Sequence, residues 1–529
     1  MKHLREPGWD RTPFGHAVSW FILVWLLHGA LPLAAQQVPV VEKSLANGMR
    51  LLLVERHDEP TVAGGWVAHV GSVNERPGIT GITHLFEHMM FKGTRTIGTK
   101  DYARDLEIIA AQERVRDDMR QEERKLRAEH RLGRIEDLLQ PESQTPRYRE
   151  LEKEFQRLIA EQRDILVKNE FDRVYSGAGC SGMNAFTSQD MTAYFITVPA
   201  NKLELWAWME SERLLCPVFR EFYAERDVVM EERRLRTEST PLGKFEEQFN
   251  AMFWQSSPYA WPIVGWPSDL PAISKAQADE FYATYYSPQN ITLILVGDFD
   301  PAKAVELARK YFERIPRGPR TPPDVVTLEM KQVAEKRMYA EAETNPQVDI
   351  LWHTVPFRHR DAYALEILSQ ILATRTGRLY KGLVLGSGVA TETWAHQAAM
   401  KWEGYFNVGG EAKAGHKPEQ VEAGIYEKLE QLKQEPVPPE ELQKVKNNFA
   451  ATEYRRLSSN YPILIHLIRN DGAGHWREIN EAGPRIQAVT AADVQRVAAK
   501  YFTRENRTVA IYTRKPGAPA AKPATQEAP

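Results

Sequence analysis

The chain has 529 residues, of which 43% are hydrophobic and 26% are charged, with a formal net charge of −3. A chain of this length exceeds what one hydrophobic core supports, so at least two domains are expected. The near-neutral charge balance offers no basic field for phosphates, which argues against a nucleic-acid-binding protein.

The N-terminus is typical of a secretory signal peptide over residues 1–35. Three basic residues, Lys2, Arg5 and Arg11, precede an apolar run at 17–33, and Ala34-Ala35 offers small residues for cleavage before Gln36. The alternative is an uncleaved anchor helix, although a His, a Gly and a Pro interrupt the run. We expect a periplasmic or secreted protein with no stable membrane span once the signal is cleaved.

The segment from Gly81 to Thr94 contains His84-x-x-Glu87-His88. On a helix, His84 and His88 lie one turn apart on one face, so both imidazoles can reach one metal ion. Glu87 lies on nearly the same side, where a carboxylate can accept a proton from metal-activated water and pass it to the leaving amine. The order is that of the inverted zinc-protease signature. Apolar neighbours predict a buried helix, and a bound metal would remove the desolvation cost of its polar side chains.

A strongly charged, helix-forming insertion occupies residues 106–171. Two amphipathic segments, the second close to a heptad pattern, flank a turn bracketed by Pro141 and Pro146. They predict an antiparallel, coiled-coil-like helical hairpin, serving either as a solvated decoration or to dock a partner or gate a cavity. The spacing rests on Val115, Met119, Leu126, Leu132, Ile135 and Leu139 in the first segment, and on Leu151, Phe155, Leu158, Gln162 and Ile165 in the second.

Strand-forming residues follow the insertion, over 183–197, after a Gly-rich loop. If the strand that contains Asn184, Ala185 and Phe186 lies at a sheet edge, its free amides can pair with an extended peptide. The alternative is an internal strand without ligand contact. Cys180 in the loop and Cys216 further on are the two cysteines of the chain, and the sequence leaves open whether they are bonded.

A second charged helix is predicted over 222–236. Glu225 and Glu232 are seven residues apart and share a face, whereas Glu231 points about a quarter-turn away. A catalytic zinc needs a third protein ligand and one open position, and this helix offers the best candidates. From periodicity alone, a solvated charged helix explains the same pattern.

The Pro-rich run within 316–329 breaks both helix and sheet and predicts a linker. It separates a first half, 36–315, from a second half, 330–514. Strand-like runs such as 291–296 alternate with amphipathic helices such as 301–312 and 361–372, which indicates α+β domains. The tail at 515–529 is dominated by Ala and Pro and is expected to be disordered.

Taken together, these segments resemble the pitrilysin/insulinase family, the zinc peptidases that include the mitochondrial processing peptidase. The resemblance covers roughly residues 38–514 and implies two related α/β-sandwich halves that face each other across a cavity. Besides the two charged helices it rests on Leu45-Ala-Asn-Gly48, Gly65–Ser72, Asn184–Ser188, Ser257-Pro-Tyr259 with Gly265, and Tyr286–Asp298.

The resemblance assigns roles to the candidate residues. It implies one zinc ion per chain held by His84, His88 and Glu232, with Glu87 as the general base and Glu225 orienting a ligating histidine. It also places Asn184 and Ala185 on an edge that binds a peptide substrate.

The second half departs from the family pattern. Complete members supply an Arg and a Tyr near the bound peptide, but an alignment on Gly377-Arg378-Leu379 puts Val384 and Thr391 at those positions. Neither side chain can stabilise an oxyanion as a guanidinium or phenol does. We therefore expect an exported zinc endopeptidase subunit that forms a heterodimer with a related chain carrying the Arg and the Tyr. The alternative is a non-catalytic structural or assembly protein that retains the peptidase fold.

Overall fold

The computed structural model describes residues 37–137 and 140–517. The predicted signal peptide, most of the predicted tail and Leu139 lie outside these residues. Within the described part, no helix combines the length and the apolar character that crossing a membrane requires.

The first sheet has six strands in the order β1-β2-β6-β3-β5-β4. Strands β2 and β6 pair in parallel, and the other neighbours are antiparallel. Strand β4 forms one edge of this sheet, so its outer backbone groups have no strand partner among the described residues. The bounds are β1 Val41–Ser44, β2 Arg50–Glu55, β3 Thr61–Ala68, β4 Ser181–Thr187, β5 Thr192–Pro199 and β6 Ile291–Gly297.

One face of the first sheet is covered by helices of the first half. Apolar residues of these helices and of alternate strand positions form the largest core cluster. They belong to α2 (Ile82–Met89), α6 (Leu203–Leu215), α7 (Phe222–Arg233), α9 (Lys275–Tyr285) and α10 (Pro301–Phe312).

The second sheet has five strands in the order β7-β11-β8-β10-β9, with helices packed on one face. No helix or strand lies between α10 and β7. The strands are β7 Lys336–Ala342, β8 Gln347–Thr354, β9 Ala390–Ala399, β10 Gly404–Ala412 and β11 Arg507–Arg514. The helices of this half are α11 Arg360–Ala373, α12 Pro418–Gln434, α13 Pro439–Arg456, α14 Asn460–Gly472, α15 Glu478–Ala488 and α16 Ala491–Tyr501.

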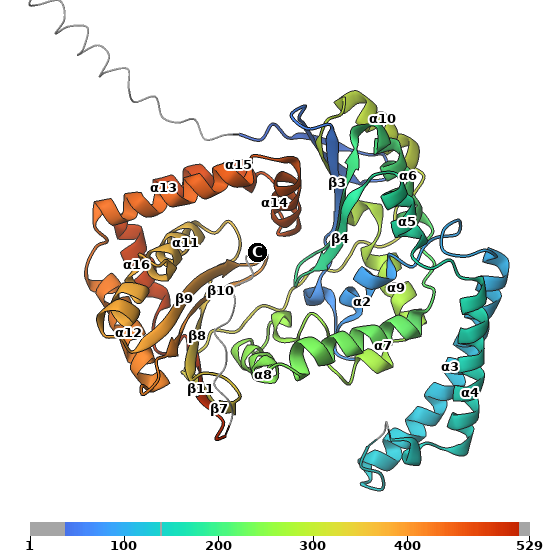
Figure 1. Ribbon diagram of the computed structural model, residues 1–529, viewed down its shortest axis with the longest axis horizontal. Helices are drawn as coiled ribbons and strands as arrows, with labels where there is room; N and C mark the ends of the chain where they lie inside the picture. The colour runs from blue at the N-terminus through green and yellow to red at the C-terminus, as the bar shows by residue number, and fades with distance from the viewer. Residues whose placement is uncertain (1–36, 138–139, 518–529) are drawn as a thin grey trace, which may run out of the picture. The chain divides into compact units, whose positions relative to one another are not determined.

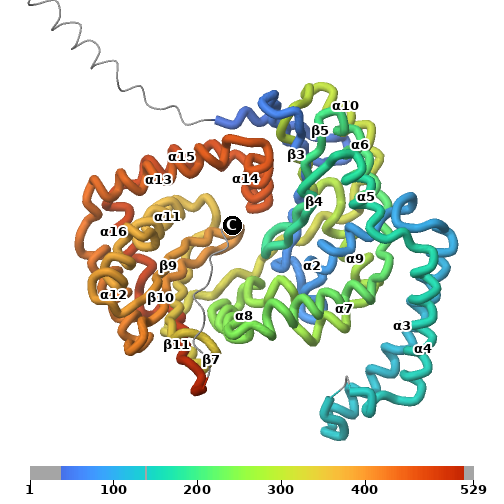
Figure 2. The backbone as a smooth tube through the Cα atoms, in the orientation of Figure 1, coloured from blue at the N-terminus to red at the C-terminus, as the bar shows by residue number. Residues whose placement is uncertain are grey.

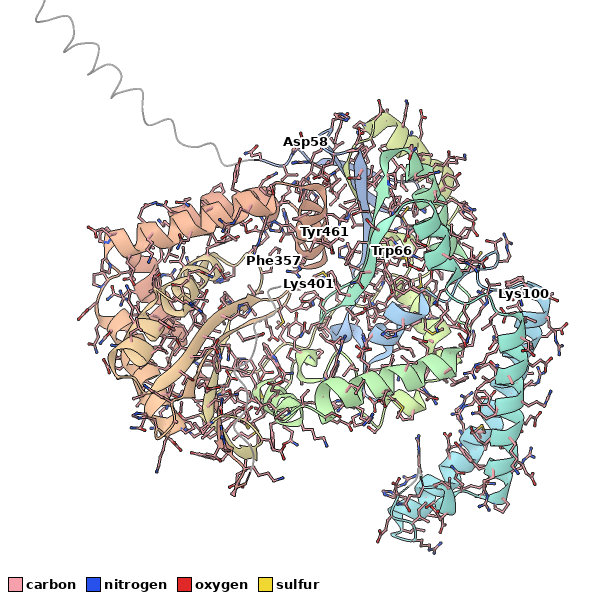
Figure 3. All side chains as sticks on the ribbon, in the orientation of Figure 1. Asp58, Trp66, Lys100, Phe357, Lys401 and Tyr461 are labelled. Atoms are coloured by element: carbon pink, nitrogen blue, oxygen red, sulfur yellow. The ribbon has the colours of Figure 1, made fainter. Side chains whose placement is uncertain are left out.

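Each half covers a sheet of the other (Figure 1). Helix α14 packs its apolar residues on the second face of the first sheet, and α8 (Gly243–Phe253) packs on the second face of the second sheet. Strand β6 is therefore buried on both faces, which explains why Thr292 is its one polar residue. A smaller link joins the sheet turns, because the backbone N–H of Lys401 (Figure 3) donates to Asp190 Oδ2 at 3.0 Å. The predicted α+β class, with two sheet-containing halves, is confirmed.

The predicted helical hairpin is present as α3 (Tyr102–Arg131) and α4 (Pro146–Ile165), which lie side by side in Figure 2. Gln112 donates to Gln162, and Thr145 near the turn donates to Glu122, so the helices run antiparallel. The predicted extent of the first segment was wrong. The helix ends at Arg131, Leu132 is exposed, and Gly133 adopts a positive φ that stops the helix.

At its base the hairpin is anchored beside α2. Arg220, 1% exposed, pairs with Asp105 of α3 at 2.5 Å and donates to the backbone oxygens of Thr94 and Ile97. Both cysteines, Cys180 and Cys216, are free thiols.

Candidate metal centre

Helix α2 forms at the predicted position and begins after a glycine. Gly81 has φ of 88°, and a Cβ there would lie 2.5 Å from the carbonyl oxygen of Val264, so only glycine fits. Leu85 and Phe86 enter the main core, which points the opposite side of the helix, with His84 and His88, toward α7.

Helix α7 brings the candidate carboxylates to α2. Val229 is fully buried and fixes the helix on the core, while Glu225 and Glu232 share the face toward the histidines. Glu231 points to solvent and pairs with Arg234 at 2.5 Å. A π-helical turn at Arg234–Glu238 follows directly, a feature that recurs at functional sites.

His84, His88 and Glu232 form what we call the metal cluster. One ligand atom from each lies within 4.8 Å of the others, and no other such group occurs in the described ranges. Glu232 Oε2 lies 3.3 Å from His88 Nε2. Glu232 Oε1 lies 3.7 Å from His84 Nε2, and this second distance is too long for a hydrogen bond. The buried Nδ1 of His84 has no hydrogen-bond partner among the described residues. Two imidazole nitrogens and a carboxylate oxygen that converge without satisfying one another fit a zinc ion.

The electrostatics of His84 favour the ligating form. The pKa of His84 is lowered to about 4, chiefly by burial, so the imidazole is neutral at pH 7. Glu232 also pairs with the exposed Arg236 at 2.6 Å. This ion pair lies on the solvent side of the carboxylate, because Arg236 is exposed.

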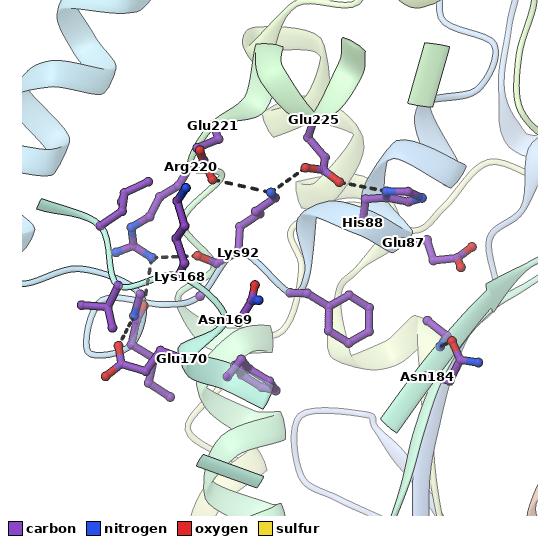
Figure 4. A pocket seen from close by; sticks show the side chains of 18 residues that line it. Glu87, His88, Lys92, Lys168, Asn169, Glu170, Asn184, Arg220, Glu221 and Glu225 are labelled. Carbon is purple, nitrogen blue, oxygen red and sulfur yellow. Dashed lines mark hydrogen bonds and ion pairs between the residues drawn. The ribbon is translucent and has the colours of Figure 1, made fainter. Parts of the chain in front are cut away.

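Glu225 orients His88 through Nδ1, whereas the other ring nitrogen faces Glu232; Figure 4 shows the bond to Glu225. Its Oε1 lies 2.9 Å from His88 Nδ1, and its Oε2 lies 2.5 Å from Lys92 Nζ. Burial alone would lower the pKa of His88, but the bond to Glu225 leaves this pKa raised. For Glu225, burial alone would raise the pKa, but His88 and Lys92 leave it lowered. The Nδ1 bond leaves His88 Nε2 directed at Glu232.

Glu87 stands apart from the metal cluster, beside the sheet edge. The hydroxyl of Thr187 in β4 donates to Glu87 Oε2 at 2.7 Å. Burial raises the pKa of Glu87, against the lowering effect of this hydrogen bond. A carboxylate with a raised pKa is better matched to proton transfer near neutral pH.

A pocket of about 480 Å³ connects Glu87 and His88 with the edge strand. Asn184 is exposed on β4 and Ala185 is buried, and both line the pocket, whereas Phe186 does not. The far wall is residues 166–171, where the helical insertion returns to the core. Figure 4 shows Glu87 and Asn184 on the same side of this space.

In the second half, Val384 and Thr391 stand at the predicted Arg and Tyr positions, and neither carries a guanidinium or a phenol. Val384 packs partly against the second core, and the hydroxyl of Thr391 donates to Glu411 at 2.6 Å. The nearby Arg378 is held by Glu441 in two hydrogen bonds of 2.7 and 3.1 Å. Its guanidinium is therefore already engaged within this half.

Two residues at the site were not singled out from the sequence. Thr187 lies within the quoted Asn184–Ser188 run and Lys92 within the Gly81–Thr94 run, but spacing alone cannot reveal contacts between separate elements. The signal available for Lys92 was its place one turn after His88.

Comparisons with known proteins find zinc peptidases among the relatives of this chain. A family described as "Insulinase (Peptidase family M16)" matches residues 50–119, and "Peptidase M16 inactive domain" matches residues 272–449. The zinc protease PqqE of Helicobacter pylori is 26% identical over 501 residues, covering 92% of this chain and 95% of the relative.

Solved structures share the fold. A protease from Helicobacter pylori superposes with a TM-score of 0.73 at 22% identity, covering 90% of this chain and 100% of the other. The periplasmic protease PqqL from Escherichia coli gives a TM-score of 0.66 at 16% identity, covering 92% of this chain and 49% of the other.

Proposed function

Because this chain belongs to the pitrilysin/insulinase (peptidase M16) family, we propose that it is an exported, zinc-dependent endopeptidase subunit. The observation that carries the proposal is the convergence of His84, His88 and Glu232 beside Glu87, a carboxylate that Thr187 orients. Glu232 forms ion pairs with His88 and Arg236, yet the cluster still brings one ligand atom of each residue to a common space.

His84, His88 and Glu232 would hold the zinc ion. When bound, zinc acts as a Lewis acid that polarises the scissile carbonyl and makes water more acidic. Glu87 then accepts the proton of the attacking water on its carboxylate and delivers it to the leaving amine. Thr187 orients Glu87 by donating to Oε2, which leaves Oε1 available for that proton.

An extended peptide is the substrate that the sheet edge suits best. The unpaired outer edge of β4 can add a further strand, with affinity from main-chain hydrogen bonds rather than from sequence. The exposed Asn184 adds a side-chain amide at this edge, and the neighbouring pocket takes a side chain close to the scissile bond. Peptides and unfolded protein segments meet this requirement.

A related partner chain would complete the site. Val384 and Thr391 supply neither a guanidinium nor a phenol, and Arg378 is engaged by Glu441. A partner of the same fold that carries the Arg and the Tyr would stabilise the developing oxyanion. Export to the periplasm or beyond follows from the predicted signal peptide, and the name of the periplasmic relative PqqL is consistent with it.

The alternative is a non-catalytic assembly protein with the same fold. Its support is the description "inactive domain" of the family that matches residues 272–449, together with the missing Arg and Tyr. A retained metal cluster and base argue against it, because a purely structural protein has no need of either.

The test is Glu87→Gln, assayed for metal and for peptide hydrolysis. Wild-type protein should carry about one zinc ion per chain, and the variant should keep it, because the ligands persist. Hydrolysis, measured with the partner chain present, should fall by at least about 100-fold, since proton transfer is lost. Full activity of the variant would disprove the mechanism, and a wild-type chain without zinc would favour the assembly protein.

A further inference from the structure

Helix α2 lacks a side-chain cap of its own. Its N-cap residue is Gly81, which has no side chain, and the first turn contains no acidic residue. The first backbone N–H groups of any helix have no partner within the helix, and they need acceptors when they are buried. In α2 this turn carries His84, so whatever fixes the turn also fixes a candidate metal ligand.

Glu75 supplies the missing acceptors from six residues upstream. One of its carboxylate oxygens accepts the N–H of Gly81 at 2.8 Å, and the other accepts the N–H of Thr83 at 2.8 Å. The residue is only 6% exposed. Burial raises the pKa of Glu75, whereas the two backbone donors lower it and favour the ionised carboxylate. A carboxyl group placed at such a desolvation cost is held there by the fold around it.

We propose that Glu75 is a positioning residue of the metal centre, which caps α2 and thereby sets the direction of His84 toward Glu232. Glu75 touches neither a ligand nor substrate, so it acts only through the helix. This inference rests on the proposed function, because it presumes that the metal cluster binds zinc.

A neighbouring carboxylate provides a matched control. Asp269 Oδ2 accepts the N–H of Gly78 at 2.9 Å and the hydroxyl of Thr80 at 2.7 Å. It thus holds the same loop through the same kind of bond, but it does not reach α2. If Glu75 served only to stabilise the loop, loss of either carboxylate would have the same consequence for zinc binding.

The experiment compares Glu75→Gln with Asp269→Asn in the full chain, measuring zinc affinity by competition with a chelator. A glutamine keeps the shape, but its amide group has one acceptor, so its NH₂ faces a backbone N–H. Zinc affinity of Glu75→Gln should fall about 10-fold, as for other groups that orient ligands, while Asp269→Asn should stay within about 2-fold of wild type. Circular dichroism of the zinc-free proteins checks that both variants are folded.

Three outcomes distinguish a failure of the positioning role from a failure of the proposed function. Equal zinc affinity of wild type and Glu75→Gln overturns the positioning role alone, and so does an equal loss in both variants. A wild-type chain that binds no zinc overturns the proposed function and the positioning role with it. Should Glu75→Gln be insoluble, Glu75→Asp, which withdraws the carboxylate by one methylene, must weaken zinc binding relative to Asp269→Asn.

Discussion

Two partly buried clusters bring histidine and carboxylate together, and they differ in how their polar groups are paired. In the cluster of Arg50, His69 and Asp471, here called the anchor cluster, Asp471 accepts Arg50 at 2.6 and 2.8 Å and lies 3.1 Å from His69. Every charge has its counterpart. In the metal cluster, His84 makes no hydrogen bond to Glu232, and within the part of the chain that the structure describes its Nδ1 has no partner.

The difference shows how to distinguish a binding site from a structural ion pair. The anchor cluster joins α14 of the second half to strand β2, and this structural role needs no ligand beyond the cluster's own contacts. The metal cluster has donors of the right kind that converge on a space none of them fills. The pKa of His84 is lowered to about 4 because the effect of burial outweighs the attraction of Glu232.

The largest expected effect distinguishes two neighbouring carboxylates on α7, Glu231 and Glu232. Glu232→Gln should lose zinc, because a ligand oxygen with full charge is replaced by a neutral amide, and hydrolysis should fall by at least about 100-fold. Glu231→Gln should keep both, since Glu231 contacts only Arg234 at the surface. Metal analysis after gel filtration measures the bound zinc. Zinc loss in Glu231→Gln, with retention in Glu232→Gln, would show that Glu231 is the ligand and that Glu232 is not.

A smaller effect is expected from the second half. The chain alone should bind zinc yet hydrolyse peptides poorly, and a related chain with the Arg and the Tyr should raise the rate at least about 10-fold. Arg378 resembles the anchor cluster in being fully engaged, so Arg378→Ala should leave the restored rate unchanged.

Co-purification from the source organism with mass spectrometry would identify the partner. A fully active monomer or homodimer would contradict the two-chain arrangement, and a loss of rate in Arg378→Ala would show that this guanidinium serves the substrate.

The sequence predicted what local spacing determines. The i, i+4 histidines and the i, i+7 glutamates placed both metal-site helices, and strand-forming residues over 183–197 indicated the region of β4 and β5. Spacing could not show that α14 covers the first sheet while α8 covers the second, because an apolar helix face does not specify which sheet it meets. The cap from Glu75 could not be predicted either, since its bonds to Gly81 and Thr83 depend on how the loop before α2 folds back.

The smallest expected effect concerns the anchor cluster and has a defined pH dependence. Burial would raise the pKa of Asp471, but His69 and Arg50 lower it to about 2. A depressed pKa stabilises the folded chain above the unfolded value near 3.9, and this contribution is lost as the pH falls toward 2. The shift corresponds to about 2 kcal/mol.

Asp471→Asn should therefore destabilise the chain by about 2 kcal/mol more at pH 6 than at pH 2.5, while zinc binding at pH 7 is retained. Chemical denaturation at the two pH values measures this difference. Asp298→Asn is the control, because Asp298 pairs with His57 at 2.7 Å but both side chains are exposed, where such a pair contributes little. Equal pH dependence in the two variants would mean that α14 is held on the first sheet by its buried Ile463, Leu464 and Leu467 rather than by the ion pair.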